Sequence, residues 1–526
     1  MRLANRSALA AAALLASLAP SPIPALAQKA AGPPPDLDRY VARVMQEFQV
    51  PGLSVAIVKD GKVVVAKGFG VRELGKPGKV DAGTRFGIAS NTKIFTATAL
   101  ALLVEEGKLE WDAPVIRYLP AFAMYDPYVT RELTVRDLLV HRSGLGLGAG
   151  DLMWWPSSDY SREEIVKRLR YIKPATSFRS AYAYDNVLYS VAGEVIKAVS
   201  GQSWEDFVSS RILAKIGMTG SNVRASLATR GDNDAMTHAE VEGTVRPITP
   251  FTNDNVDPAG GINSSAADMA KWLIVQLDSG RVADGSRLFS PRSTRQLWGM
   301  VTPIPIGDPA PELAALRPEF NGYALGLGVR DYRGRKILTH TGGLPGYVSQ
   351  VTMVPSLRLG VVVLTNQESG SAFQSITFHV LDHYLGVPPT DYVSIYSQLD
   401  KRQAARFDSV TSAASTVRDS ASGPSLPIER YAGRYTDPWY GEIQIGREGN
   451  GLAIRFTHTP SLVGDLIHWQ YDTFVARWRD RELRADAYLT FSLNPDGSIS
   501  HARMQAVSPA TDFSYDFQDL YLTPMK

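Results

Sequence analysis

A serine and a lysine three residues apart are the first side chains in this sequence that could do chemistry together. Ser90 and Lys93 belong to the only Ser-x-x-Lys in the chain, directly before the apolar run from Ile94 to Val104. Residues at this spacing share one face of a helix, so the amine can reach the hydroxyl. A serine becomes a strong nucleophile when a neighbouring base takes its proton. A lysine can be that base where burial and a helix N-terminus lower its pKa.

The same four residues have an ordinary structural interpretation. Ser90 could cap the helix, and Lys93 could extend its amine to solvent along the apolar surface. The flanking helix is apolar almost all round and is followed by Gly107, which is typical of a buried central helix. This context favours the catalytic interpretation, and the other motifs must decide.

A second motif is Tyr184-Asp185-Asn186, the only Tyr-x-Asn in the chain. A phenol beside a lysine ammonium can titrate low enough to relay protons. The amide of Asn186 could bind a substrate carbonyl from the same loop. The alternative is a surface tyrosine that only packs its ring.

A third motif follows a predicted strand and consists of His340, Thr341, Gly342 and Gly343. Glycines at a strand end let a substrate approach the backbone closely. The N–H groups of Ser90 and Gly343 could together form an oxyanion hole, which acyl transfer requires. The alternative is a simple turn at the strand end.

Other hydrolase classes are not indicated. The chain has no Gly-x-Ser-x-Gly, so an α/β-hydrolase is not expected. His379 and His383 share a helix face but lack the glutamate of a zinc hydrolase. We therefore expect neither a metal site nor a cofactor.

The N-terminus reads as an export signal. Residues 1–27 contain two arginines, an apolar stretch from Ala8 to Leu18 and an Ala-Leu-Ala cleavage site before Gln28. The apolar stretch is too short to span a bilayer comfortably. We expect cleavage, a periplasmic or secreted protein and no stable membrane anchor, with an uncleaved anchor as the alternative.

Charge and cysteine content limit the partners. The chain has 55 basic and 53 acidic residues, and the signal carries two of the basic ones, so the mature charge is zero. This balance indicates neither a nucleic acid nor an anionic membrane as partner. Cysteine is absent, so the fold has no disulfide and no cysteine for lipidation. The expected partner is a small-molecule or peptide-like acyl substrate.

The elements that would position these motifs are helices and antiparallel strands from both ends of one region. A hairpin signal at Lys59-Asp60-Gly61 joins two predicted strands. The pattern predicts an α+β fold with helices packed on an antiparallel sheet. The predicted strands are 52–58, 62–68, 335–340, 347–354 and 359–365, and the predicted helices include 36–48, 162–172, 187–200, 269–277 and 377–385.

The length of 526 residues implies more than one domain. Residues 28–36 form a leader and residues 37–388 a catalytic domain. Residues 389–426 are polar, helical and then serine-rich, and are predicted as a linker. Residues 427–526 contain short aromatic strands separated by turns, which predicts a small all-β sandwich or barrel.

The three motifs, in this order, resemble those of the class C β-lactamase and D-alanyl-D-alanine carboxypeptidase family of serine hydrolases. Segments 138–145, 260–268 and 361–366 resemble the same family's framing segments. The resemblance covers roughly residues 37–388. The last hundred residues, with Tyr431 to Tyr435 and Leu466 to Trp469, resemble a small β-domain often appended to such enzymes.

The resemblance implies a role for each motif residue. Ser90 would be the nucleophile, and Lys93 and Tyr184 would share the general-base and general-acid work. Asn186 would hold the acyl amide or ester. His340 and Thr341 would line the site, and the N–H groups of Ser90 and Gly343 would form the oxyanion hole. Gly342 would belong to the same substrate-binding segment. The implied reaction is acylation of Ser90, loss of the leaving group and hydrolysis by water.

Two residues depart from the family pattern. Asp185 replaces a small residue and would add negative charge if it faced the site. His340 stands where lysine is usual, and histidine is mostly neutral at pH 7. This favours an esterase or D-amino-acid peptidase or amidase. The alternatives are a β-lactamase or D-Ala-D-Ala carboxypeptidase (a penicillin-binding protein), and a non-catalytic β-lactam-binding or sensor protein.

Overall fold

Two runs of β-branched and aliphatic residues far apart in the chain become neighbouring strands. In the computed structural model, which describes residues 32–525, β1 (Gly52–Lys59) pairs antiparallel with β12 (Leu359–Thr365). Both strands are buried along their whole length, because helices cover the sheet on both faces. The Lys59-Asp60-Gly61 turn leads from β1 into β2 (Lys62–Gly70), as predicted. The signal peptide predicted for residues 1–27 lies outside the described residues.

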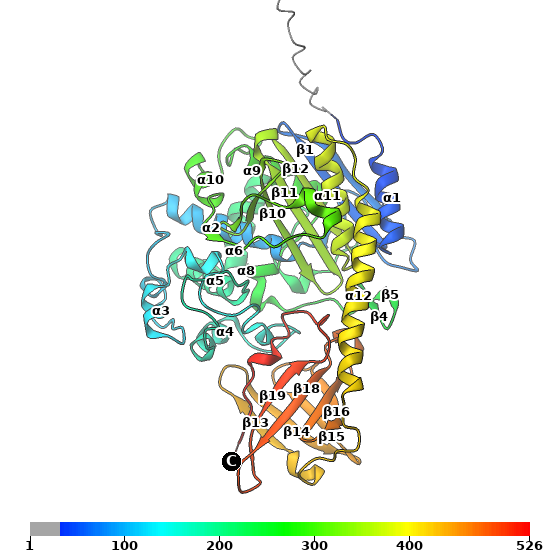
Figure 1. Cartoon of the computed structure of the whole chain (residues 1–526). Coiled ribbons are helices and arrows are strands. Elements are labelled where there is room, and N and C mark those ends of the chain that lie inside the picture. The colour runs from blue at the N-terminus through cyan, green and yellow to red at the C-terminus, as the bar shows by residue number, and fades with distance from the viewer. Residues whose placement is uncertain (1–31, 526) are drawn as a thin grey trace, which may run out of the picture.

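These strands belong to an antiparallel sheet in the order β2-β1-β12-β11-β10-β9-β8-β7. One face is covered by α1 (Leu37–Glu47) and α11 (Gly370–Leu385), and the other by α9 (Ala266–Leu277) and the helices behind it (Figure 1). The predicted α+β architecture is therefore confirmed. The remaining strands are β7 (Thr302–Pro303), β8 (Asn321–Tyr323), β9 (Gly328–Tyr332), β10 (Arg335–Leu344) and β11 (Tyr347–Val354).

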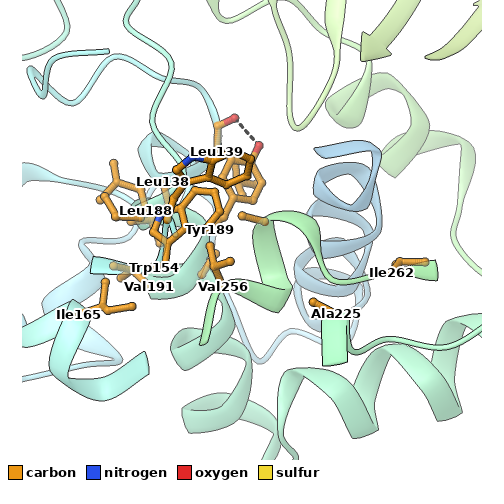
Figure 2. Close-up of a cluster of buried hydrophobic side chains, with 14 of the residues drawn as sticks. Leu138, Leu139, Trp154, Ile165, Leu188, Tyr189, Val191, Ala225, Val256 and Ile262 are labelled. Carbon is orange, nitrogen blue, oxygen red and sulfur yellow. Dashed lines mark hydrogen bonds between the residues drawn. The ribbon is translucent and has the colours of Figure 1, made fainter. Parts of the chain in front are cut away.

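Helix α2 (Lys93–Glu105) is the centre of the helical part and is buried on almost every residue. It packs against α5 (Val187–Ser200), whose side chains join a compact apolar cluster beside it (Figure 2). Within this cluster the Tyr189 hydroxyl donates a hydrogen bond to the Leu139 carbonyl at 2.8 Å. This packing holds the start of α5, and with it the Tyr184–Asn186 loop.

Shorter helices complete the helical part around α2. They are α3 (Pro127–Glu132), α4 (Arg162–Arg168), α6 (Trp204–Val208), α7 (Ala214–Ile216), α8 (Asp257–Gly260) and α10 (Pro291–Leu297). Two small ribbons pair β3 (Phe86–Gly87) with β6 (Asn263–Ser264) and β4 (His238–Val241) with β5 (Thr244–Pro247).

The segment predicted as a linker contains a long helix, α12 (Tyr392–Thr416). Its first turns bury Tyr392, Val393 and Tyr396 against α11, and it then runs down to the second unit (Figure 1). Beyond its end, the Arg418 guanidinium donates to the Trp469 carbonyl at 2.7 Å. The connection between the two units is therefore largely helical. Helix α11 also starts earlier than the predicted 377, because Ser369 caps it at the Ala372 N–H.

The C-terminal unit is a nearly closed all-β barrel of eight antiparallel strands, which settles the choice between sandwich and barrel. A bridge between Ala502 and Leu522 links the two ends of the strand order. Large side chains such as Tyr431, Phe474 and Trp478 are buried inside, as expected for a barrel of this size. The strands are β13 (Gly433–Asp437), β14 (Gly441–Glu448), β15 (Gly451–Phe456), β16 (Val463–Gln470), β17 (Thr473–Trp478), β18 (Ala487–Leu493), β19 (Ile499–Ala506) and β20 (Thr523–Pro524).

Within residues 32–525, no helix has both the length and the apolar character that crossing a membrane requires.

Candidate active site

Ser90 lies in a short 3-10 turn, Ala89–Thr92, between β3 and α2 rather than inside the helix itself. Ala89, directly before it, has a φ of 49°, a left-handed conformation that is uncommon for a residue with a side chain. Two hydrogen bonds at Ile88 fix the turn. The Ile88 N–H donates to the Ile262 carbonyl at 2.9 Å, and the Ser349 hydroxyl donates to the Ile88 carbonyl. Because these hydrogen bonds hold the strained backbone, Ser90 is kept in one place.

The amine of Lys93 is fully buried beside Ser90 and makes three short contacts. Its Nζ lies 3.0 Å from Ser90 Oγ, 2.8 Å from Asn186 Oδ1 and 3.0 Å from the Ala259 carbonyl oxygen. The two carbonyl oxygens can only accept hydrogen bonds. A neutral amine would therefore donate to both of them and present its lone pair to the Ser90 hydroxyl.

Burial lowers the pKa of Lys93 to about 7, while the charges of Asp151 and Asp185 act in the opposite direction. A substantial fraction of Lys93 is then neutral near pH 7. The geometry and the lowered pKa together allow this lysine to take the proton of Ser90.

Tyr184 lies against the same pair, with its ring centroid 4.9 Å from Lys93 Nζ. Burial raises its pKa well above 10, and a hydrogen bond with Ser90 only partly offsets this. The prediction that this phenol titrates low beside Lys93 is therefore wrong, because desolvation raises its pKa. In the free site Tyr184 is a protonated phenol, suited to donating a proton.

Asn186 connects Lys93 to a carboxylate that no sequence motif indicated. Its Oδ1 accepts from Lys93, and its Nδ2 donates to Asp151 Oδ2 at 2.8 Å. Asp151 is completely buried and also accepts from Trp154 Nε1 at 2.8 Å and Ser514 Oγ at 2.9 Å. Burial raises the pKa of Asp151 to about 7 despite these donors. The other hydrogen of the Asn186 amide has no partner among residues 32–525 and remains for a substrate carbonyl.

Asp185 does not face the cleft. Its side chain is completely buried, with a carboxylate oxygen 3.8 Å from His141 Nδ1, and neither oxygen has a side-chain hydrogen-bond partner among residues 32–525. Burial raises the pKa of Asp185 to about 7, and the Lys93 charge partly opposes this. The pKa of His141 is lowered well below 6.5, first by burial and then by Lys93. Asp185 thus lies beneath the site and does not repel an incoming substrate directly.

His340 is neutral and held at both ring nitrogens. Its Nδ1 lies 2.5 Å from the Thr341 carbonyl oxygen and its Nε2 lies 2.6 Å from the Tyr323 hydroxyl. Because a carbonyl only accepts, Nδ1 carries the hydrogen and Nε2 accepts from Tyr323. Burial, followed by the Lys93 charge, lowers the pKa of His340 to about 3. Among the described residues, no cation therefore occupies this position, where the family that the motifs resemble usually has lysine.

The two glycines of the third motif act differently. A Cβ on Gly342 would lie 2.2 Å from the Ile88 carbonyl oxygen, so this glycine lets β10 pack against the Ser90 turn. A Cβ on Gly343 would meet nothing within 4 Å, so open space adjoins it. Leu344 pairs with Tyr347 across the two-residue turn between β10 and β11. Hydrogen-bonded and non-hydrogen-bonded pairs alternate along an antiparallel ladder, so the next pair, Gly343 with Val348, is not hydrogen-bonded. The Gly343 N–H therefore points away from β11. Thr341 is exposed on the same strand.

Two cavities border Ser90. A narrow one, of about 50 Å³, is lined by Ser90, Asn186 and Gly343, and a wider one, of about 460 Å³, by Ser90, His340 and Thr341. Tyr184 and Phe513 line both cavities. The structure thus brings all eight predicted site residues to one cleft, or directly behind its wall.

Phe513 belongs to residues 512–516 of the C-terminal unit, a segment that packs against the catalytic unit at this cleft. The Phe513 ring is 41% exposed and packs edge-on against Tyr184, with centroids 6.1 Å apart. Asp516 anchors the segment by accepting from the Gly150 N–H at 2.6 Å and the Leu152 N–H at 3.0 Å. Ser514, which lies between Phe513 and Asp516 in the sequence, donates a hydrogen bond to Asp151. No local pattern could reveal these partners, because more than 300 residues separate them.

No group of three histidine, cysteine or acidic side chains suited to a metal ion occurs in the described part of the chain. The His379 ring stacks on Tyr40 at 3.8 Å, and its Nε2 lies 3.1 Å from Asp36 Oδ1. His383 Nε2 lies 3.0 Å from the Gly32 carbonyl oxygen. These two histidines tie α11 to the start of the described chain.

Comparison with known sequences agrees with this architecture. The sequence pattern of the beta-lactamase family matches residues 37–385, and that of a domain of unknown function, DUF3471, matches residues 417–524. The chain therefore belongs to the beta-lactamase family and is a serine hydrolase of that fold, with an appended β-domain.

Among curated relatives, unguisins hydrolase ungD of Aspergillus violaceofuscus is 28% identical over 461 residues, covering 81% of this chain and 78% of the relative. Unguisins hydrolase ungD' of Aspergillus campestris is 29% identical over 487 residues, covering 88% of each chain.

Solved structures share the fold. The octameric penicillin-binding protein homologue from Pyrococcus abyssi has a TM-score of 0.58 at 23% identity and covers 93% of this chain and 99% of its own. The D-amino acid amidase from Ochrobactrum anthropi has a TM-score of 0.54 at 22% identity, covering 67% of this chain and 98% of its own. The first of these extends over both units of the present protein.

Proposed function

We propose that this protein is an exported hydrolase that cleaves an ester or amide bond through an acyl-Ser90 intermediate. The observation that carries the proposal is the buried amine of Lys93, 3.0 Å from Ser90 Oγ and held by two carbonyl oxygens. Burial brings the pKa of this amine to about 7, so it can act as a base at physiological pH.

In the proposed reaction, neutral Lys93 takes the proton of Ser90 as Oγ attacks the substrate carbonyl. The developing oxyanion is stabilised by the N–H groups of Ser90 and Gly343. The protonated phenol of Tyr184 gives its proton to the leaving group, and the Lys93 ammonium then returns a proton to Tyr184. Water attacks the acyl-Ser90 ester with the same groups in their roles, and Ser90 is released.

The preferred substrate is an ester or a D-amino-acid amide rather than an anionic β-lactam or a peptide C-terminus. His340 is neutral and engaged at both nitrogens, so it offers no charge to a substrate carboxylate. The names of the relatives are consistent with a hydrolase, since two are unguisins hydrolases. One structural neighbour, a D-amino acid amidase, is consistent with an amide substrate.

A turnover panel tests this proposal. The purified protein is assayed with p-nitrophenyl acetate, a D-amino-acid p-nitroanilide and nitrocefin, each beside the Ser90→Ala variant. We expect Ser90-dependent turnover of the ester or the anilide and little turnover of nitrocefin. Rapid nitrocefin hydrolysis with inert ester and anilide would overturn the substrate preference. Acylation without turnover of any substrate would instead indicate a binding or sensor protein.

Export is tested separately. When the full chain is produced in a Gram-negative host, we expect the periplasmic protein to begin at Gln28. Retention of residues 1–27 on a membrane-bound product would contradict cleavage.

A further inference from the structure

A large cavity of about 800 Å³ lies between the catalytic unit and the β-barrel. It shares five lining residues with the narrow cavity that contains Ser90 and Asn186, so the two spaces adjoin. The shared residues are Trp155, Phe251, Gly343, Leu344 and Asp512.

The barrel wall of this cavity is fixed to the catalytic unit by ion pairs. The Arg484 guanidinium binds both oxygens of Glu368, at 2.6 and 2.8 Å. Glu482 accepts from Arg246 at 2.6 Å and from the Thr249 N–H at 2.8 Å. These contacts cross the domain boundary at the cavity itself, so its shape is built into the fold.

The lining is apolar with an acidic rim. Its apolar part includes Trp155, Ile248, Phe251, Leu344, Val348 and Tyr515. Its charged residues are five acids (Glu240, Glu368, Asp480, Glu482 and Asp512) and one base, Arg484. Arg484 is paired with Glu368 and Arg246 with Glu482, so Glu240 and Asp480, unpaired among the described residues, leave the field inside the cavity negative. Glu240 lines the wall and is exposed.

We propose that this interdomain cavity is a substrate subsite on the Asn186 side of Ser90. It would take an apolar extension of the substrate that is neutral or cationic, and would disfavour an anionic one. The inference rests on the proposed acyl-Ser90 chemistry and deepens it. The cavity on the His340 side is also wide, and its lining base, Arg330, donates to the Leu316 carbonyl. A substrate can therefore extend on both sides of the scissile bond, which favours an internal ester or amide bond over a terminal one.

Four p-nitrophenyl esters test the subsite: the acetate, the octanoate, the 8-(trimethylammonio)octanoate and the 8-sulfooctanoate. We expect kcat/KM for the sulfonate to be at least about tenfold below that for the octanoate, with the cationic ester equal to or above the octanoate. The acetate is too short to enter the cavity and reports only the chemistry at Ser90. High salt should reduce the difference between the charged esters.

Two charge reversals supply the matched comparison. Glu240→Lys should change the cation-to-anion ratio of kcat/KM by at least about fivefold toward the anion. Glu429→Lys, at an exposed barrel position outside the cavity, should change neither this ratio nor the turnover of the acetate. Glu240→Gln, a milder change, should shift the ratio in the same direction.

The subsite and the acyl-Ser90 chemistry are contradicted by different results. Equal kcat/KM for all three long esters would overturn the subsite. So would an unchanged cation-to-anion ratio of kcat/KM in a Glu240→Lys protein that still turns over the acetate. Absence of Ser90-dependent acetate turnover and of acylation would overturn the proposed function itself.

Discussion

Replacing Asp185 with asparagine should stabilise the protein by an amount that grows between about pH 4 and pH 7 and stays constant above pH 7. The Asp185 carboxylate is completely buried without a side-chain hydrogen-bond partner among the described residues, and burial raises its pKa from 3.8 to about 7. Between these pH values the unfolded chain has lost a proton that the native protein keeps, so stability falls as pH rises. At 1.36 kcal/mol per pH unit, this gap corresponds to about 4 kcal/mol. Asparagine has no proton to lose and avoids this cost.

Urea unfolding of both proteins at pH 4, 6 and 8 measures the effect. We expect similar unfolding free energies at pH 4 and an advantage for Asp185→Asn of about 4 kcal/mol at pH 8. Because the negative charge of Asp185 raises the pKa of Lys93, the rising limb of kcat/KM should also move to lower pH in the variant. Asp408→Asn, at an exposed position on α12, should show neither effect. A constant difference at all three pH values, or a less stable variant at pH 8, would refute the reasoning.

Three further substitutions test the site. Lys93→Ala should abolish acylation in a protein that still folds, because Ser90 loses its base; retained burst kinetics in stopped-flow would contradict this. Tyr184→Phe should lower kcat by about 10²-fold or more, the usual scale of general acid–base catalysis, and an unchanged rate would remove this phenol from the mechanism. Ser514→Ala removes one of three side-chain donors to buried Asp151 and should cost about 1–3 kcal/mol in urea unfolding together with part of kcat. Ser514→Thr should restore both quantities, and a neutral Ser514→Ala would show that the barrel does not support the site.

Local patterns were enough to predict which motif residues lie together at the cleft. The spacing of Ser90 and Lys93 depends only on helix geometry, and the structure shows the two side chains in contact. Alternation and turn chemistry likewise predicted β1, β2 and the antiparallel sheet. The neutrality of His340 was also expected, although its cause, a bond to Tyr323 combined with burial, required the fold.

The remaining features depend on contacts between distant segments. Asp151 joins Asn186 to Ser514, and Phe513 covers the cleft, yet no motif marks these residues. The high pKa of Tyr184 was mispredicted because the motifs indicate that the phenol meets Lys93 but say nothing about its desolvation. Burial is a property of the whole fold, and it decided the protonation of the site.

Mass spectrometry after treatment with a small fluorophosphonate tests the central claim most directly. We expect one covalent adduct per chain, on the peptide that contains Ser90, with no adduct in Ser90→Ala and a strongly slowed reaction in Lys93→Ala. An adduct on another serine, or none on a folded protein, would contradict it.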